Sequence, residues 1–444
     1  MTRLAFVSLF ACLLAPSLHA QTQPSAEAAL NPTDPRQWVV VEAETREQRT
    51  KIAECGFSIE NVEGKKVSGI ADPKVLACVQ AAGFKILSAK PLGSFKPEDF
   101  PSWDAAYHNV KETNEELQKI VSENGFASVG SAGRSWQGRD IPVLRLNTSP
   151  YGPTKPGVLF MAAHHAREHL TTEVVLGLAQ YIVQNSRDPV IGALLGSRDL
   201  YFMPMVNPDG KEFDVAKGEY EWQRKNMRDN GDGSVGVDLN RNYGWGWNTT
   251  GASTYPGSDT YQGPEAFSEP ETKAVRDFLR SHRNITAIVS YHSYGKKVLY
   301  PWSYTYDPVP DPKALAAFKT IGDRMGKLSG YKSMQSSDMY ASGGDTCDWA
   351  WGELKMYCIT IELSGNGFYP GANAIAPALK ENVGGAVYLM QIADDPSAAG
   401  REAVASAPEA GVAAKTEKSE GFKRGMAQME NSVAAPAAAF DGKK

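Results

Sequence analysis

Short apolar runs alternate with amphipathic stretches near the N-terminus of the chain. The pattern predicts strands at 38–42, 65–70 and 84–88 and helices at 45–55 and 73–82. Asp72 followed by proline is a typical helix start, which supports the second helix. The β-α-β-α-β order predicts a small α+β unit over about residues 37–90. This stretch contains no histidine and no clustered acid–base set, so we assign it no chemistry.

From Tyr107 onward the apolar runs are longer and again alternate with amphipathic segments. Strands are predicted at 143–146, 158–162, 200–205, 286–290 and 357–361, and helices at 113–122, 172–184 and 268–279. Thr113 and Glu116 form a capping-box pattern at the first of these helices. Such alternation predicts an α/β fold with helices on both faces of a sheet.

Three residues with catalytic potential follow predicted strands directly. His165, His292 and Glu362 each come just after an apolar run. Ligands in α/β folds bind beyond the carboxyl ends of strands. We therefore expect three separate segments to converge on one edge of the sheet.

The two ends of the chain differ from its middle. Residues 1–20 have one Arg, a short apolar run and small residues before Ala20, which predicts a secretory signal peptide cleaved near that residue. The protein is therefore expected to be secreted or periplasmic. No later apolar segment approaches the ~18 residues needed to span a membrane. The Ala-rich tail, 395–444, has few large apolar residues, and we predict that it is disordered.

Composition excludes one class of partner. The chain has 444 residues and a formal net charge of −5. Nucleic-acid binding is therefore not expected, because it needs a basic surface. The 42% hydrophobic and 22% charged residues are typical of a soluble globular protein.

Four cysteines remain after the predicted signal peptide. Locality favours the pairs Cys55–Cys78 and Cys347–Cys358, and disulfides are expected in an exported protein. Four buried thiols are the alternative.

Two histidine motifs carry the chemistry. One is His165-Ala-Arg-Glu168-His169, and the other is Ser290-Tyr-His292-Ser-Tyr294. Imidazole and carboxylate ligands suit zinc, and three of them leave a position open for water. An isolated His-x-x-Glu also occurs by chance, and a lone histidine is usually a surface or core residue. The metal hypothesis therefore depends on the rest of the chain.

Further motifs follow in a specific order. They are Asn207-Pro-Asp-Gly210, Gly236-Val-Asp-Leu-Asn-Arg-Asn242, Tyr340 nine residues before Trp349, and a strand ending in Glu362-Leu363. Together with the histidine motifs, they resemble the zinc metallocarboxypeptidases A, B and T over about residues 105–393. The bacterial, carboxypeptidase T-like branch is the most similar.

The resemblance implies a fold and a domain organisation. The catalytic domain, 102–394, would contain a mixed, mainly eight-stranded twisted sheet flanked by helices on both faces. Residues 21–101 would be a propeptide, made of the small α+β unit and a linker, and would be a possible inhibitor of the same chain. We expect a monomer that acts on the C-termini of peptides or proteins.

The resemblance also implies the metal site. His165, Glu168 and His292 would bind one zinc ion per chain. Asp238 would orient His165 through the other ring nitrogen, as carboxylates commonly do for metal-bound histidines. Glu362 would be the general base for a zinc-activated water that hydrolyses the last peptide bond.

Substrate-binding residues are implied in the same way. Asn240 and Arg241 would hold the terminal carboxylate, which suits the fork of a guanidinium. Tyr340, near a pair of glycines, would close over the terminal residue. Arg167 and Tyr294 would contact the residue upstream of the scissile bond.

The chain departs from the family at the arginine that stabilises the oxyanion. Trp222-Gln-Arg-Lys-Asn-Met-Arg228 has Met227 at that position. We expect Arg228 to supply the charge by a one-residue shift, with Arg224 as the alternative. The resemblance also implies which residue lines the floor of the pocket for the terminal residue. It is the residue two positions before Trp349, which here is Cys347. A neutral floor favours neutral terminal residues, while the nearby Asp345 could admit Lys or Arg.

Three other functions remain open from sequence. The string HxxEH is also the inverzincin signature, in which His165 and His169 both bind zinc and Glu168 is the base. A related enzyme on the same fold could cleave peptidoglycan stem peptides or deacylate amino acids. A zinc-free binding module that has lost catalysis is the third alternative, and the intact ligand set argues against it.

Overall fold

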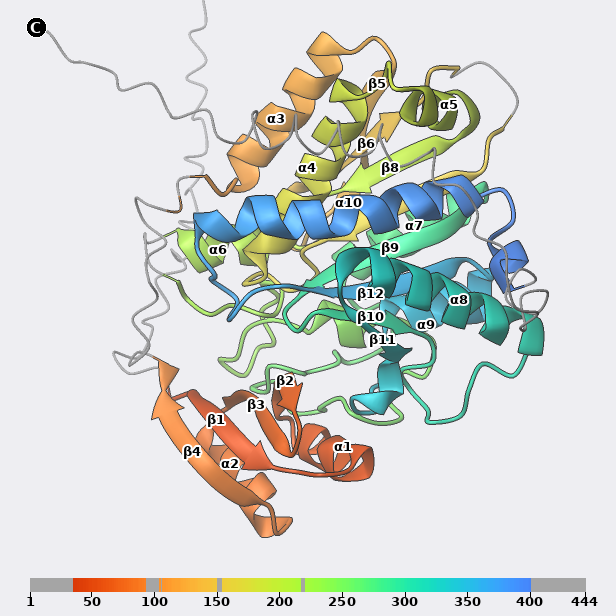
Figure 1. Ribbon diagram of the computed structural model, residues 1–444. Helices are drawn as coiled ribbons and strands as arrows, with labels where there is room; N and C mark the ends of the chain where they lie inside the picture. The colour runs from red at the N-terminus through yellow and green to blue at the C-terminus, as the bar shows by residue number, and fades with distance from the viewer. Residues whose placement is uncertain (1–34, 93–103, 105, 150–153, 217–219, 401–444) are drawn as a thin grey trace, which may run out of the picture. The chain divides into compact units, whose positions relative to one another are not determined.

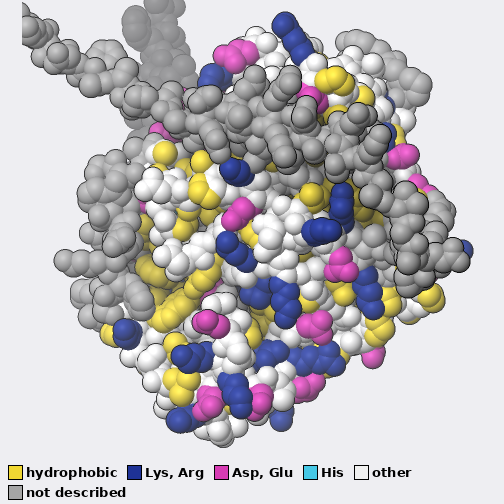
Figure 2. Space-filling view, in the orientation of Figure 1, with side chains coloured by type: hydrophobic (Ala, Val, Ile, Leu, Met, Phe, Trp, Pro, Cys, Tyr) yellow, Lys and Arg dark blue, Asp and Glu magenta, His cyan; other side chains and the backbone are white. Residues whose placement is uncertain are grey.

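The computed structural model describes residues 35–92, 104, 106–149, 154–216 and 220–400 (Figure 1). The predicted signal peptide and the tail beyond residue 400 lie outside the described residues. The described chain contains a four-stranded and an eight-stranded sheet. On the face shown in Figure 2, basic and acidic side chains are interspersed.

The N-terminal subdomain, residues 35–92, contains all five elements predicted from the pattern, plus one strand that was missed. Its elements are β1(Gln37–Glu42), α1(Arg46–Glu54), β2(Ser58–Glu63), β3(Lys66–Ala71), α2(Pro73–Ala81) and β4(Lys85–Pro91). The strands are antiparallel in the order β2-β3-β1-β4. The missed strand is β2, whose sequence Ser-Ile-Glu-Asn-Val-Glu has too few apolar residues to form a run.

The eight-stranded sheet has the order β11-β10-β12-β9-β7-β8-β6-β5. Its strands are β5(Ala127–Arg134), β6(Asp140–Leu146), β7(Gly157–Ala162), β8(Asp199–Met203), β9(Ile285–Ser293), β10(Lys297–Tyr300), β11(Lys332–Gln335) and β12(Tyr357–Leu363). The four central strands β12, β9, β7 and β8 are parallel. The five predicted strands are present, whereas β5, β10 and β11 were missed because they are short or polar and lie at or near the sheet edges.

Helices cover both faces of this sheet, as predicted. They are α3(Val110–Glu123), α4(His169–Gln184), α5(Pro189–Ser197), α6(Pro208–Val215), α7(Pro270–Ser281), α8(Pro312–Ser329), α9(Thr346–Leu354) and α10(Ile375–Ile392). Along β7, Val158 and Phe160 join the apolar core with α3, α4, α5, α8 and α10. Leu159 and Met161 join a second core with α7 and α9. Because successive side chains of a strand point to opposite faces, a continuous apolar run fills both cores.

The start of α3 and the beginning of the tail differ from the predictions. The capping box of α3 is Asn109 with Glu112, so this helix begins three residues before the predicted start. The prediction of a disordered tail from residue 395 is wrong for its first residues. Pro396–Ala398 form a short 3-10 helix, and Ala399 is buried against α8 and its neighbours.

Both disulfides favoured by locality are present, Cys55–Cys78 and Cys347–Cys358. The first joins the end of α1 to α2, and the second joins α9 to β12. Disulfides form in oxidising compartments, so the pairing agrees with export of the protein. None of the described helices is long and apolar enough to cross a bilayer.

Candidate metal and substrate site

The carboxyl ends of three parallel strands meet at the candidate site. β9 lies between β12 and β7, and the register places Glu362 of β12 opposite His292 of β9. His165 follows the end of β7 by three residues. The predicted convergence is therefore confirmed. His292 and Glu362 are the second-to-last residues of their strands, however, and do not lie in the loops beyond them.

His165, Glu168 and His292 form a buried group whose ligand atoms all lie within 4.8 Å of one another. Glu168 Oε1 is 2.7 Å from His165 Nδ1, and Glu168 Oε2 is 3.1 Å from His292 Nδ1. The two Nδ1 atoms are 3.2 Å apart. Two imidazoles and one carboxylate that converge in this way fit a zinc ion with one position open.

The other side of His165 is held by Asp238. His165 Nε2 is 3.1 Å from Asp238 Oδ1, and Asp238 Oδ2 accepts a hydrogen bond of 3.0 Å from Arg224 Nε. Burial raises the pKa of Asp238, but the neighbouring Arg224 and His165 outweigh it and hold that pKa well below its usual range. An ionised Asp238 orients the ring so that Nδ1 faces the metal group.

Glu362 is partly buried at the end of β12, beside the metal group. Burial raises the pKa of its carboxyl to about 7, with Glu168 adding to the rise and His292 and Lys297 opposing it. Lys297 is its register partner on β10. A carboxyl with a pKa near neutrality is suited to accept a proton and return it.

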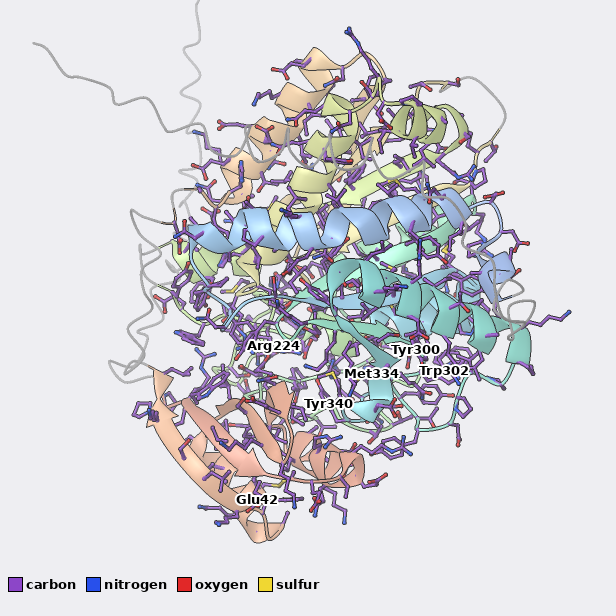
Figure 3. The ribbon with its side chains drawn as sticks, viewed as in Figure 1. Glu42, Arg224, Tyr300, Trp302, Met334 and Tyr340 are labelled. Atoms are coloured by element: carbon purple, nitrogen blue, oxygen red, sulfur yellow. A yellow bond between two sulfur atoms is a disulfide. The ribbon has the colours of Figure 1, made fainter. Side chains whose placement is uncertain are left out.

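The residues assigned to the terminal carboxylate lie together. Arg241 Nη2 is 3.2 Å from the Tyr340 hydroxyl, and Arg241 Nε is buried without a hydrogen-bond partner among the described residues. Tyr340 and Arg224 are labelled in Figure 3. Gly344, with φ +76°, lies so close to Arg241 that a Cβ there would be 2.2 Å from its carbonyl oxygen. The loop can therefore pack on Arg241 only with glycine at this position.

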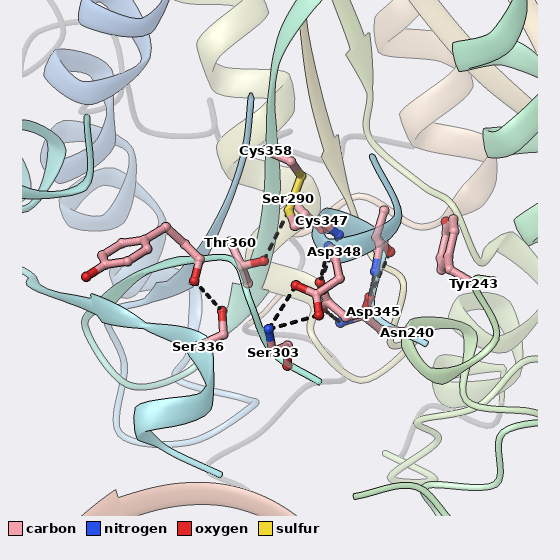
Figure 4. The surroundings of a disulfide bond; sticks show 12 residues. Asn240, Tyr243, Ser290, Ser303, Ser336, Asp345, Cys347, Asp348, Cys358 and Thr360 are labelled. Atoms are coloured by element: carbon pink, nitrogen blue, oxygen red, sulfur yellow. Dashed lines mark hydrogen bonds between the residues drawn. A yellow bond between two sulfur atoms is a disulfide. The ribbon is translucent and has the colours of Figure 1, made fainter. Parts of the chain in front are cut away.

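Asn240 is tied to the loop that precedes α9 (Figure 4). Its side-chain amide donates to Asp345 Oδ2 at 3.0 Å, and its oxygen accepts from the Thr346 hydroxyl at 2.7 Å. The other oxygen of Asp345 caps α9 through the backbone N–H groups of Cys347 and Asp348. Both Asp345 and the disulfide-bonded Cys347 are buried.

Arg167 occupies a fully buried position next to Glu168. It donates to Asp259 at 2.9 Å and also to Glu60 of β2. Its guanidinium lies 4.4 Å from the centroid of Phe368, whose ring packs edge-on against Tyr294.

Arg224 and Arg228 occupy different surroundings. Arg224 is buried on the side of its segment that faces the metal group. Its Nη2 is 2.9 Å from Asp238 Oδ2, and its Nη1 is 3.7 Å from Glu60 Oε1. Arg228 pairs with Glu269 at 3.0 Å and lies over the ring of Trp136. The structure thus brings the alternative, Arg224, to the metal group and does not bring Arg228 there. A one-residue shift cannot move Arg228 inward, because neighbouring Asn226 is also anchored to Glu269 and Glu271.

Two carboxylates at the site were missed from the sequence. Glu60 lies on the strand that was not predicted, and Asp259 lies in a loop without periodicity. The alternation of Ser58, Ile59 and Glu60 was the only available signal for the first, and it is too short to be specific.

His169, the last residue of the HxxEH string, points away from the metal group. Its Nε2 is 2.8 Å from Asp214 and its Nδ1 is 3.0 Å from the Lys211 ammonium. Glu168 and His169 lie at the start of α4, not inside a helix that contains the whole motif. The inverzincin alternative is therefore wrong for this chain.

Comparisons with known proteins agree with the site. A family model described as zinc carboxypeptidase, peptidase M14, matches residues 113–385. A zinc carboxypeptidase from Saccharothrix mutabilis subsp. capreolus is 36% identical over 410 residues, covering 86% of this chain and 94% of that protein. Human carboxypeptidase A1 is 33% identical over 287 residues, covering 62% of this chain and 68% of that protein.

Solved structures show the same fold. Bovine thrombin-activatable fibrinolysis inhibitor, in complex with tick carboxypeptidase inhibitor, matches with a TM-score of 0.58 and 27% identity, covering 66% of this chain and 99% of that one. Carboxypeptidase A from Helicoverpa armigera matches with a TM-score of 0.64 and 24% identity, covering 85% and 100% of the two chains. The resemblance carried by the motifs is confirmed, and the chain belongs to the zinc carboxypeptidase family, peptidase M14.

Proposed function

We propose that this protein is an exported carboxypeptidase that releases single residues from the C-termini of peptides or proteins. The observation that carries the proposal is a buried arginine beside the His165–Glu168–His292 group. The backbone N–H of Arg241 donates to Asp238, the residue that contacts His165, and Arg241 Nε has no hydrogen-bond partner within the part of the chain that the structure describes. Zinc, when bound by that group, lowers the pKa of a water and polarises a carbonyl. Release of one residue at a time from a synthetic peptide, followed by mass spectrometry, tests the proposal.

Glu362 carries the proton in this proposal. Its carboxylate accepts a proton from the attacking water and returns it to the amine of the leaving residue. The pKa of about 7 supports both steps, because the group is near balance between its two forms at neutral pH.

The terminal residue is proposed to be mainly neutral. Asp345 is buried, and its two oxygens already accept bonds from Asn240 and from the start of α9. A lysine or arginine side chain would have to compete with these donors. A peptide series that varies only the terminal residue should show faster release of apolar than of basic residues, and exclusive release of basic residues would contradict this preference.

Arg224 is proposed to stabilise the oxyanion in place of Arg228. A buried guanidinium beside the metal group is pre-oriented for developing negative charge, and loss of one such donor lowers kcat by about 10²- to 10³-fold. We expect this loss for Arg224→Ala. The matched variant Arg228→Ala should lose less than about tenfold, because it breaks a remote ion pair with Glu269. Equal losses in steady-state kinetics would contradict the assignment.

Residues 21–101 are proposed to be an inhibitory propeptide. Glu60 of β2 reaches Arg167 and Arg224, the two arginines proposed to contact substrate. On α1, Arg49 donates to the Asp338 carbonyl at 2.9 Å, and the Thr50 hydroxyl accepts from Ala341 N–H at 2.9 Å, on either side of Tyr340. These contacts would hold the loop of Tyr340 closed and fill the substrate site.

Glu60→Gln is expected to raise the activity of the uncleaved chain by at least about tenfold, because a charge-assisted hydrogen bond to buried arginine is lost. Glu63→Gln, on the exposed end of the same strand, is the matched control and should change little. Activity should be measured before and after cleavage between residues 92 and 104. An uncleaved wild type as active as the cleaved form would contradict inhibition.

A further inference from the structure

Asp214 of α6 is a fully buried carboxylate that binds three separate segments of the chain. It accepts the backbone N–H of Gln223 at 2.6 Å. His169 Nε2 lies 2.8 Å from its Oδ2. The Tyr369 hydroxyl donates to the same carboxylate at 3.0 Å. No step of the proposed reaction uses this residue.

Each of the three segments carries a residue of the proposed site. Gln223 directly precedes Arg224, and His169 directly follows Glu168. Tyr369 directly follows Phe368, the ring that lies under the guanidinium of Arg167. Asp214 therefore bonds the sequence neighbours of a metal ligand, of the proposed oxyanion arginine and of the ring that packs on Arg167 and Tyr294.

Two of these segments are also joined to each other. The backbone N–H of Arg167 donates to the Gln223 carbonyl at 2.7 Å, and that of Ala166 donates to the Arg224 carbonyl at 3.1 Å. Segments 166–169 and 223–224 thus form one unit. The third segment, 368–369, packs on this unit through its rings, with Phe368 against Arg167 and Tyr369 edge-on to Trp222. The hydrogen bond from the Tyr369 hydroxyl to Asp214 is the one contact that loss of a single oxygen atom removes while the rings stay in place.

The helix that presents Asp214 is itself fixed to the site. Lys211, one turn earlier on α6, contacts His169 Nδ1 at 3.0 Å. Asn207, at the start of α6, donates to the carbonyls of His164 and Lys225. These contacts fix the position of the Asp214 carboxylate, and its bonds in turn fix the positions of the three segments relative to one another.

We propose that Asp214 is a positioning residue that aligns Arg224 and Arg167 with the metal group, and that its bond to Tyr369 sets the enzyme's use of the substrate residue upstream of the scissile bond. The inference rests on the proposed function. Misplacement of a reacting group by about 1 Å lowers rates by about 10²-fold, so an interaction outside direct contact with substrate can have a large effect.

The test compares two substrates with the same terminal residue. One is an N-acetyl amino acid, which has no residue upstream of the scissile amide, and the other is an N-acetyl dipeptide. The full-length chain is folded, cleaved between residues 92 and 104, and assayed for kcat, KM and zinc content. The variants are Tyr369→Phe and Asp214→Asn. The control is Tyr107→Phe, which removes a hydroxyl bonded to Gly371 of the same loop.

For Tyr369→Phe we expect the ratio of kcat/KM, dipeptide over amino acid, to fall about fivefold at unchanged zinc content, since one hydrogen bond to a charged group is lost. Tyr107→Phe should leave the ratio unchanged. Asp214→Asn should lower kcat on both substrates by about 10- to 100-fold and still bind one zinc.

Other outcomes overturn the inference in distinguishable ways. An unchanged ratio in Tyr369→Phe shows that the bond to Asp214 does not set the use of the upstream residue. The same fall in Tyr107→Phe shows that general loosening of the loop is enough to lower the ratio. Loss of zinc from Asp214→Asn in proportion to its activity shows a structural role only. If the wild type releases no terminal residue from either substrate, the proposed function fails and the positioning role fails with it.

Discussion

Glu362→Gln is expected to lower kcat by about three orders of magnitude and to leave the metal bound. General acid–base catalysis contributes about 10²- to 10⁴-fold, and an amide at this position can neither accept nor return the proton. Glutamine keeps the size of the side chain at the end of β12, so the register with His292 should persist. Steady-state kinetics and zinc analysis of the same preparation give both numbers.

The pH dependence gives an independent check on the same residue. The carboxylate form is the active base, so kcat/KM should fall as the pH drops through the pKa of Glu362, which burial raises to about 7. The residual activity of Glu362→Gln should lack this acidic limb. A variant that retains more than about a tenth of wild-type kcat would remove Glu362 from the mechanism.

His292→Ala is expected to abolish stoichiometric zinc binding and, with it, activity. Mutation of a residue that only orients a ligand lowers metal affinity by about 10- to 100-fold, so removal of a ligand itself should lower the affinity further. His169→Ala is the matched variant, because it removes the neighbouring imidazole that bonds Asp214 and Lys211. It should keep one zinc per chain and lose activity only in part.

Zinc content after dialysis separates these two histidines. Full metal in His292→Ala together with its loss in His169→Ala would reverse the ligand assignment. Circular dichroism of both variants controls for unfolding, since each residue is buried.

The central strands and the helices around them could be predicted because burial on both faces demands a continuous apolar sequence. Val158 to Ala162 is such a run, and its alternate residues fill two different cores. The edge strands gave no such pattern. β5 reads Ala-Ser-Val-Gly-Ser-Ala-Gly-Arg, and its side chains are largely exposed or half-buried.

Much of the candidate site could be predicted from motif order, since the metal group lies at or near strand ends and Asp238 and Arg241 share one contiguous motif. Spacing could not predict that Arg224 lies beside Asp238 while Arg228 pairs with Glu269, because these positions depend on which side of the segment faces Asp238. The contacts of Glu60 depend on tertiary packing between segments more than 100 residues apart, with 107 positions separating it from Arg167. Periodicity carries no information about such pairings.

The most direct test of the account uses one peptide in two forms, with a free C-terminal carboxylate and with a C-terminal amide. The cleaved wild-type protein should remove single residues from the acid and act on the amide at least about 100-fold more slowly, because the amide leaves Arg241 unpaired. Mass spectrometry of the products gives both rates. Equal rates on the two forms, or cleavage at internal bonds, would contradict a carboxypeptidase.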